Sequence, residues 1–321
     1  MDSITQAVLG GSIGEAVLGK KTGNTGALIG AAVATIPDLD VVLYLFYNKF
    51  DMLSIHRGFS HSILFSLMGA FLIAYILQRL KWTEMIGYWR LWVFSWLALF
   101  THILLDAFTA YGTQLFLPFS DKRVGFDSIN VVDPVYTLPL LIGLLFNLFV
   151  YKARPSRPVF NKIGLAVSSL YLLGTLGVKS HVSNYFQEEL SEQNIAYHSL
   201  LTMPVGVANI SWYGVAKTKD GLLMHKYSVL NDEQPAFEYF PINDHLLEGL
   251  NPVLVDRMKW FAKGFYTVQK DSGQVRFYNL QVDMRGIVQD GKTKAPTAGY
   301  FVITPHADGS FDFSSGTHRM D

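Results

Sequence analysis

The chain has 321 residues, 50% of them hydrophobic and 16% charged, whereas about a quarter of the residues of an ordinary soluble domain are charged, so a membrane protein is favoured. Basic and acidic residues balance at 26 each, so no net field attracts nucleic acid and nucleic-acid binding is disfavoured. Cysteine is absent, which excludes thiolate chemistry and leaves His and carboxylates as the strong metal ligands.

The first half of the chain predicts membrane helices. The opening segment, Ile4 to Leu18, is apolar but short and carries Glu15, so we predict a re-entrant or half-spanning helix. A basic n-region is missing before it, so a cleaved signal peptide is not expected. Five later stretches approach the length of a membrane span: 27–47, 62–80, 91–110, 134–151 and the more polar 160–179. Residues 1–180 are therefore expected to form an α-helical membrane domain with about five spans.

Basic residues gather in three connecting loops, and such loops favour the cytoplasm. The clusters are Lys20 with Lys21, then Arg79, Lys81 and Arg90, then Lys152, Arg154, Arg157 and Lys162. They alternate as a multi-pass topology requires. The loops 49–61 and 112–133 and the whole C-terminal region are therefore expected on the outer face of a bacterial inner membrane.

Residues 181–321 have the composition of a soluble domain. Segments of strand character occur at 210–217, 222–230, 264–270, 274–284 and 299–304. Pairs such as Asp220-Gly221 and Asp290-Gly291 are hairpin signals between strands. Residues 242–261 are more helical, although Pro252 interrupts them. We predict a small α+β or mainly β extracytoplasmic domain.

Ionisable residues inside apolar segments are costly and mark functional sites. Asp38 and Asp40 lie in AVATIPDLDVVLYLF, where Pro37 can break the helix. Helical residues two apart point to nearly opposite sides. Both aspartates face one site only if the backbone is irregular there; otherwise one is a ligand and the other supports the site.

Two histidine-containing motifs follow. The third predicted span ends in THILLDAFTAYGTQLFLPFS, which places His102 and Asp106 at i and i+4 on one helix face. The loop before the second span contains HRGFSHS, with His56, Arg57 and His61. Arg57 is a candidate for holding a substrate anion through a bidentate contact.

The predicted topology allows these side chains to converge on a metal. Imidazoles and carboxylates suit zinc, with manganese or iron as alternatives, and their number permits one ion or two. A metal there would lower the pKa of a bound water and supply hydroxide for hydrolysis. Glu15 is a catalytic candidate or, equally, a buried helix–helix contact. Asp133, which precedes Pro134, is expected to cap a helix.

The remaining sequence features do not point to a catalytic site. The sequence lacks the GxSxG, phosphate-loop and Rossmann patterns. A series of small residues is expected to pack helices closely: Gly10, Gly11, Gly14, Gly26 and Gly30.

Five segments occur in order over residues 1–145: MDSITQAVLGGSIGEAVLGKKTGN, PDLD, HRGFSHS, THILLDAFTAYGTQLFLPFSDKRV and VVDPVYTLPLL. With them the chain resembles the LexA-regulated, membrane-bound family of predicted metal-dependent hydrolases. The resemblance implies a membrane metal-dependent hydrolase with these residues at the motif positions: Asp38, Asp40, His56, His61, His102 and Asp106. Many relatives have His after the opening Thr, where this chain has Gln6, which removes a ligand but leaves a hydrogen-bonding group.

Three functions are compatible with these features. The first is an enzyme in which metal-activated water attacks an ester, phosphoester or amide at the outer membrane face. Membrane lipids are then the expected partners, and a lipid or membrane-associated molecule is the candidate substrate. The alternative is non-catalytic binding or transport of a metal ion or proton; the lack of inverted repeats favours the enzyme. The third is a scaffold whose metal only links the helices.

Overall fold

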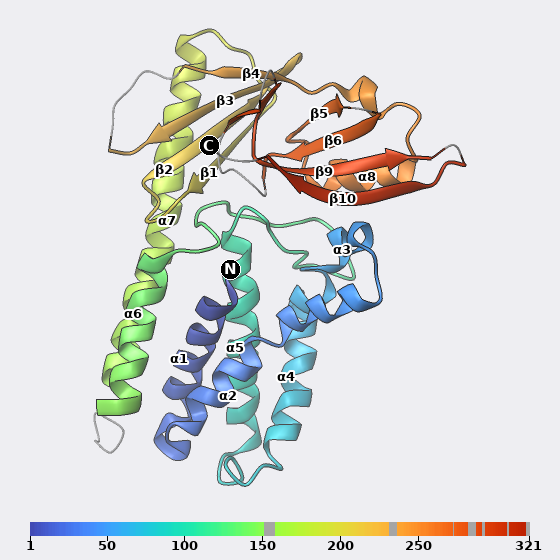
Figure 1. Cartoon of the computed structure of the whole chain (residues 1–321). Helices are drawn as coiled ribbons and strands as arrows, with labels where there is room; N and C mark the ends of the chain where they lie inside the picture. The colour runs from blue at the N-terminus through green and yellow to red at the C-terminus, as the bar shows by residue number, and fades with distance from the viewer. Residues whose placement is uncertain are drawn as a thin grey trace. The chain divides into compact units, whose positions relative to one another are not determined.

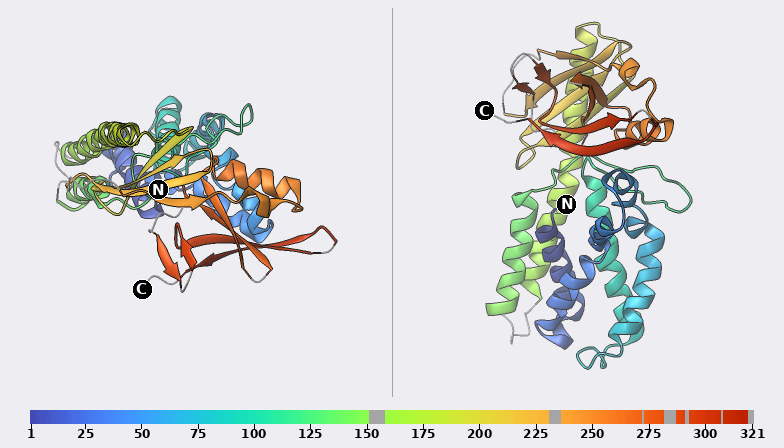
Figure 2. Two further views of the ribbon diagram at one scale, coloured as in Figure 1. Left: turned by 90° about the horizontal axis from the view of Figure 1, so that it is seen from above. Right: turned by 45° about the vertical axis from the view of Figure 1, so that its right-hand side comes forward.

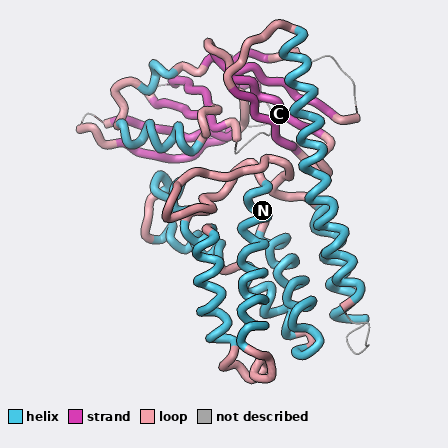
Figure 3. Tube along the Cα trace, turned by 180° about the vertical axis from the view of Figure 1, so that it is seen from behind, coloured by secondary structure: helices cyan, strands magenta, loops and turns pink. Residues whose placement is uncertain are grey.

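The computed structural model describes residues 1–150, 158–230, 236–271, 273–281, 287–290, 293–306 and 308–318. The chain divides into two compact units. The first, Met1–Leu43 with Ile55–Gly177, is helical, and the second, Tyr44–Ser54 with Val178–Asp321, contains all of the described strands (Figures 1 and 3). The helix α7 (Val159–Glu192) belongs to the first unit up to Gly177 and to the second from Val178.

Helices α1 (Ser3–Thr22) and α2 (Thr25–Ala34) form a tight hairpin in the first unit. The Asp2 side chain caps α1 by accepting a hydrogen bond from the backbone N–H of Thr5 at 2.9 Å. Gly23, with φ of +61°, follows the last turn of α1, a conformation that glycine adopts without a steric penalty. The chain can therefore reverse at once into α2.

The glycines between α1 and α2 let the two backbones approach closely. A Cβ atom on Gly14 would overlap the carbonyl oxygen of Gly26, and one on Gly30 would overlap that of Gly10. The predicted role of these residues in close helix packing is confirmed, because any side chain there would push the helices apart.

Three further helices of the first unit pack against this hairpin or against one another. They are α4 (Ile63–Leu77), α5 (Tyr88–Phe108) and α6 (Pro134–Leu145), the last continued by a π-helical turn, η3 (Phe146–Val150). Helix α1 packs on α5 and α6, and α4 packs on α5. Leu91, Phe94 and Leu99 of α5 are fully buried in the core. The carboxylate of Asp133 accepts hydrogen bonds from the first turn of α6, which confirms its predicted capping role.

The number of membrane spans is smaller than the five predicted. In the described residues two helices, α5 and α7, are each long and apolar enough to cross a membrane. The number rises to four if each of two bent pairs is one span: α2 with η1 (Pro37–Leu45), bent by 53°, and residues 49–61 with α4, bent by 56°. Helix α6 with its π-helical turn, Pro134–Val150, is apolar but shorter than these spans over the described residues. Conversely, α1 is a regular 20-residue helix that extends beyond the predicted Leu18.

Two basic clusters lie at the same end of the first unit. The Lys21 ammonium donates to the carbonyl of Met85 at 3.3 Å, and Arg90 Nε donates to that of Val17 at 3.0 Å. The C-terminal end of α1 therefore lies beside the α4–α5 connection, as the right-hand view of Figure 2 also shows.

Antiparallel sheets confirm the β-rich character expected of the second unit. One sheet has the order β1-β2-β3-β4, formed by Ser199–Val205, Ser211–Lys217, Gly221–Ser228 and Glu238–Pro241. The other has the order β10-β9-β6-β5, formed by Phe311–Thr317, Gly299–Pro305, Gln274–Asn279 and Tyr266–Asp271. A hairpin of β7 (Val288–Asp290) and β8 (Thr293–Ala295) is separate. Phe186 of α7 and Trp212 of β2 are fully buried together.

The short helices of the second unit differ from the sequence prediction. Pro252 does not interrupt a helix but begins one, α8 (Pro252–Phe261), and Asn251 caps it by accepting from the backbone N–H of Val253. Proline suits this position because the first turn of a helix needs no N–H donor. Helix α3 (Lys49–Ile55) is largely part of the second unit although it lies early in the chain.

Candidate metal centre

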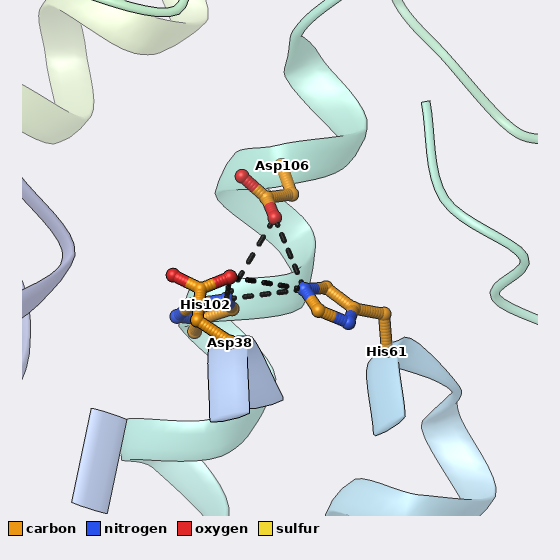
Figure 4. Close-up of side chains that lie close together, drawn as sticks. All are labelled: Asp38, His61, His102 and Asp106. Atoms are coloured by element: carbon orange, nitrogen blue, oxygen red, sulfur yellow. Dashed lines mark hydrogen bonds and ion pairs between the residues drawn. The ribbon is translucent and has the colours of Figure 1, made fainter. Parts of the chain in front are cut away.

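Four potential ligand atoms converge inside the first unit. Asp38 comes from η1, His61 from η2 (Phe59–His61), and His102 and Asp106 from α5. One ligand atom from each lies within 4.8 Å of all the others. Figure 4 shows Asp106 and His102 on successive turns of α5, with Asp38 and His61 reaching them from separate elements. The structure therefore contains a cluster able to hold a metal ion.

The spacing of these atoms fits a tetrahedral ion. His61 Nε2 lies 3.3 Å from His102 Nε2, 3.5 Å from Asp38 Oδ1 and 3.3 Å from Asp106 Oδ2. His102 Nε2 lies 3.5 Å from Asp38 Oδ1 and 3.7 Å from Asp106 Oδ2. Ligand atoms about 2.0–2.2 Å from zinc in a tetrahedron are about 3.3–3.6 Å apart. Four of these five distances lie within the expected range, and the fifth, 3.7 Å between His102 Nε2 and Asp106 Oδ2, lies just above it.

Burial makes this arrangement costly without a cation. The side chains of His61, His102 and Asp106 are at most 1% exposed, and that of Asp38 is 22% exposed. Among the described residues, no donor forms a hydrogen bond to Asp106 Oδ2. A buried carboxylate oxygen without a hydrogen-bond donor loses its hydration at a free-energy cost, and the imidazoles of His61 and His102 beside it offset that cost only if they carry a proton on Nε2. An ion among these residues would remove that cost, and the partial exposure of Asp38 indicates the side on which the centre opens.

The other oxygen of Asp106 is held firmly. Asp106 Oδ1 accepts a hydrogen bond from Gln6 Nε2 at 3.2 Å and pairs with Arg57 Nη2 at 3.2 Å; the amino group of Met1 also contacts it. Gln6 Nε2 lies at the same time 3.2 Å from the carbonyl of His102. The expected hydrogen bond from Gln6 to the site is confirmed. These donors fix the carboxylate so that Oδ2 points at the two imidazoles.

Asp40 organises a second group of residues behind His61. Its Oδ1 is 2.9 Å from His56 Nδ1, and its Oδ2 accepts from the backbone N–H of Arg57 at 3.0 Å and from Ser60 Oγ at 3.1 Å. Ser60 Oγ and Asp40 Oδ2 are also 2.9 and 3.5 Å from His61 Nδ1. Asp40 and His56, both predicted as ligands, therefore lie outside the group of four and support His61. Partners of this kind orient a ligating imidazole.

The local sequence explains why the two aspartates diverge. Helix α2 ends at Ala34, and Pro37 begins the 3₁₀-helix η1, so the predicted break at the proline is confirmed. With 3.0 residues per turn, positions two apart in a 3₁₀-helix point about 120° apart. Asp38 thus faces the imidazoles of His61 and His102 while Asp40 faces His56. The sequence prediction expected both aspartates at one site if the backbone is irregular; the irregular backbone is present, but only Asp38 belongs to the group of four, and Asp40 has the supporting role expected of an unbroken helix.

The Arg57 side chain contacts Asp106 and two residues that follow α5. Its backbone has φ of +58°, its Nη1 donates to Thr109 Oγ1 at 3.0 Å, and its guanidinium lies 4.7 Å from the centre of the Tyr111 ring. Arg123 covers the same ring at 4.5 Å, and burial lowers the pKa of Arg123 to about 10, so Arg123 remains charged at neutral pH. Nη1 and Nη2 of Arg57 contact Thr109 and Asp106, whereas its buried Nε has no hydrogen-bond partner among the described residues. Arg57 thus holds a metal-ligand candidate in place, and its role toward a substrate anion stays a prediction.

Glu15 is not brought to the cluster. It is buried, and its carboxylate lies directly over Gly19, in the half of α1 that leads away from Gln6. Nine residues of helix separate Glu15 from Gln6 by about 13 Å. Of its two predicted roles, the placement favours the buried helix–helix contact.

Some residues at the site were not singled out in the sequence. Thr109 and Tyr111 contact Arg57, and the carbonyl of Arg57 accepts from the backbone N–H of Gln114 at 3.1 Å. Their positions directly after the HxxxD pair in THILLDAFTAYGTQ were the available signal, since residues after a helix end fold back over its last turn. Within the part of the chain that the structure describes, the four ligand atoms form a single group, which suits one ion better than two.

Comparison with known proteins supplies a family. The model of the family described as YdjM inner membrane protein matches residues 1–182. The chain is 37% identical over 180 residues to the uncharacterized protein YfhP of Bacillus subtilis strain 168, covering 54% of this chain and 51% of that protein. It is 34% identical over 96 residues to the inner membrane protein YbcI of Escherichia coli strain K12, covering 29% and 54%. The chain thus spans about half the length of these curated relatives, and no solved structure matches it.

Proposed function

This chain belongs to the YdjM inner membrane protein family, and from that premise and the ligand geometry we propose that it is a membrane-embedded metal-dependent hydrolase. Its inner-membrane location, expected from the apolar segments, is confirmed by the family and by the helices long enough to cross a bilayer. The activity is the proposal, and one observation carries it. Asp106 Oδ2 is buried without a hydrogen-bond donor among the described residues and lies 3.3 Å from His61 Nε2.

The donor set favours zinc. Two imidazole nitrogens and two carboxylate oxygens suit zinc, manganese or iron, and the near-tetrahedral spacing favours the first. A divalent metal held there supplies Lewis-acid polarisation of the scissile group and a coordinated water with a pKa near neutrality. The residues of the chain provide the rest: Asp40 and Ser60 orient His61, while Gln6 and Arg57 orient Asp106.

Exposed apolar side chains beside the ligands support a lipid-like substrate. Leu39, next to Asp38, is 59% exposed, and Phe59, two residues before His61, is 50% exposed. In a membrane protein such side chains face hydrocarbon. An ester, phosphoester or amide carried on an amphiphile could then reach the centre on the side where Asp38 is exposed.

The first prediction is that Asp106→Asn abolishes both metal binding and hydrolysis. The amide presents a weaker ligand to the ion, so bound zinc should fall by more than the ~10–100-fold that is usual for loss of an outer partner. Purified full-length protein would be analysed for zinc content and assayed on fluorogenic lipid esters, phosphodiesters and amides in mixed micelles.

His306→Gln is the matched control, because His306 is exposed in the β9–β10 hairpin and pairs with Asp312; it should keep full metal and full activity. Gel filtration would confirm that both variants remain monodisperse. A zinc-loaded wild-type protein that cleaves none of the three substrate classes would overturn the hydrolase and favour non-catalytic metal binding or transport.

A further inference from the structure

The chain passes through the second unit between two of the candidate ligands. Asp38 and His61 both belong to the first unit, but Tyr44–Ser54, which connects them, belongs to the second. The ligand spacing at the centre therefore depends on a connection whose middle is built into a different unit.

Aromatic and ionic contacts hold this connection within the second unit. The Phe50 side chain is buried, and its ring packs edge-on against Phe311 and Phe313 of β10, at 5.3 and 5.6 Å between ring centres. The guanidinium of Arg257, on α8, lies 4.3 Å from the centre of the Phe50 ring. Arg257 Nη1 also donates to Asp51 Oδ1 at 2.8 Å. Arg257 of α8 thus contacts two successive residues of the connection, Phe50 and Asp51.

The connection is also ordered internally. The backbone N–H of Asp51 donates to Asn48 Oδ1 at 2.8 Å, and Ser54 Oγ donates to the carbonyl of Asp51 at 2.9 Å. Met52 is fully buried. These contacts order Lys49–Ile55 as a short helix. Contacts that immobilise Phe50 and Asp51 therefore immobilise the whole helix.

We propose that the second unit positions the metal centre by holding Phe50 and Asp51, with Arg257 and Phe50 as positioning residues. A free connection would have to be ordered when an ion drew Asp38 and His61 together, at the expense of binding free energy. A connection anchored at its middle is already ordered on folding. This inference rests on the proposed function and assigns the second unit a role in it.

The relation is reciprocal. If anchoring the connection strengthens metal binding, metal binding must stabilise the anchored connection by the same factor. A molecule that binds the second unit and alters the contacts of Arg257 with Phe50 and Asp51 would then change metal affinity without contacting a metal-ligating residue.

The test uses the full-length protein in detergent. Phe50→Ala and Arg257→Gln should each weaken zinc binding by about 10-fold, the lower end of the range for outer partners, and should change the visible absorption of the cobalt-substituted protein. The exchange Asp51→Arg with Arg257→Asp restores the ion pair and should recover most of the affinity. Lys259→Gln is the matched control, because Lys259 is also on α8 but pairs with Asp244; it should leave affinity and spectrum unchanged.

The outcomes separate this inference from the proposed function. Wild-type zinc affinity and an unchanged cobalt spectrum in Phe50→Ala and Arg257→Gln would overturn the positioning role while leaving the metal centre intact. A loss of affinity that the charge exchange does not recover at all would also overturn it, since a merely destabilised fold gives that result. A wild-type protein that binds no metal would overturn the proposed function and, with it, this inference.

Discussion

Asp106 uses its two carboxylate oxygens for different purposes. Donors from Gln6 and Arg57 converge on Oδ1, while Oδ2 faces His61 and His102. A carboxylate fixed through one oxygen presents the other at a defined position, which lowers the entropy cost of binding an ion. Neighbours likewise hold the second nitrogen of His61, whereas His102 Nδ1 is buried without a hydrogen-bond partner among the described residues.

We expect substitutions of His61 and His56 to differ in their effect on zinc binding. We predict that His61→Ala removes essentially all bound zinc, because His61 Nε2 faces the three other ligand atoms. His56→Ala should weaken binding by only about 10-fold, because His56 acts through Asp40 at 2.9 Å.

Zinc affinity of both variants, measured by competition with a chelator, checks this order. Equal losses in the two variants would show that His56 coordinates the ion directly and would contradict the assignment of four ligands.

At the element scale, the first unit depends on contacts that side chains would prevent. Gly14 faces Gly26 and Gly30 across the α1–α2 hairpin, with no room for a Cβ atom. Helices in a membrane lack a strong hydrophobic drive to associate, so close backbone approach carries much of their packing. Because η1 follows α2 directly and Gln6 is on α1, the hairpin also sets the position of Asp38 relative to Gln6.

The same substitution should have opposite effects in two helices. Gly14→Ala places a methyl group on backbone atoms of α2 and should destabilise the protein by about 1–3 kcal/mol. Gly174→Ala, in α7, meets no atom within 4 Å and should be neutral or stabilising by up to about 1 kcal/mol.

Thermal unfolding of the two variants in the same detergent provides the comparison. A Gly14→Ala protein as stable as the wild type would mean that the two helices are not packed as closely as the structure has them.

At the scale of the whole molecule, the positions of the basic residues give the orientation in the membrane. Lys21 and Arg90 lie at one end of the first unit through their contacts with Met85 and Val17, and Asp106 lies at the opposite end of α5 from Arg90. Basic ends favour the cytoplasm. The metal centre is then expected toward the outer face. Helix α7 runs antiparallel to α6, because Ser168 Oγ donates to the carbonyl of Tyr136 and Thr175 Oγ1 to Ser128 Oγ. An outer C-terminal region therefore requires the apolar helix Pro134–Val150 to lead the chain back across the membrane as well.

We therefore predict that a reporter fused after Asp321 is active outside the cytoplasm. Alkaline phosphatase, which is active only when exported, should give high activity at that fusion, and a green fluorescent protein fusion should stay dark. A second pair of fusions after Asn24, which follows the Lys20 and Lys21 cluster, should show the reverse. A fluorescent green fluorescent protein and an inactive alkaline phosphatase at the Asp321 fusion would overturn the predicted orientation.

Features that depend on residue spacing within one element could be predicted from the sequence. The i, i+4 pair of His102 and Asp106 shares a face because helix geometry requires it, and Pro37 breaks the segment because it lacks an N–H donor. The glycine contacts and five of the ten described strands, β2, β3, β5, β6 and β9, followed from residue type and turn signals in the same way. Apolar length predicted membrane helices, although it overestimated their number, because apolar composition does not fix where a helix bends or ends.

The contacts between side chains of different elements could not be predicted in this way and are known from the folded structure. Asp40 faces His56 and not the ligand group, Arg57 pairs with Asp106, and Glu15 lies along α1 away from them. It also placed Phe50 in the second unit. These outcomes depend on how separate elements pack in three dimensions, and residue spacing along the chain contains no direct record of that packing.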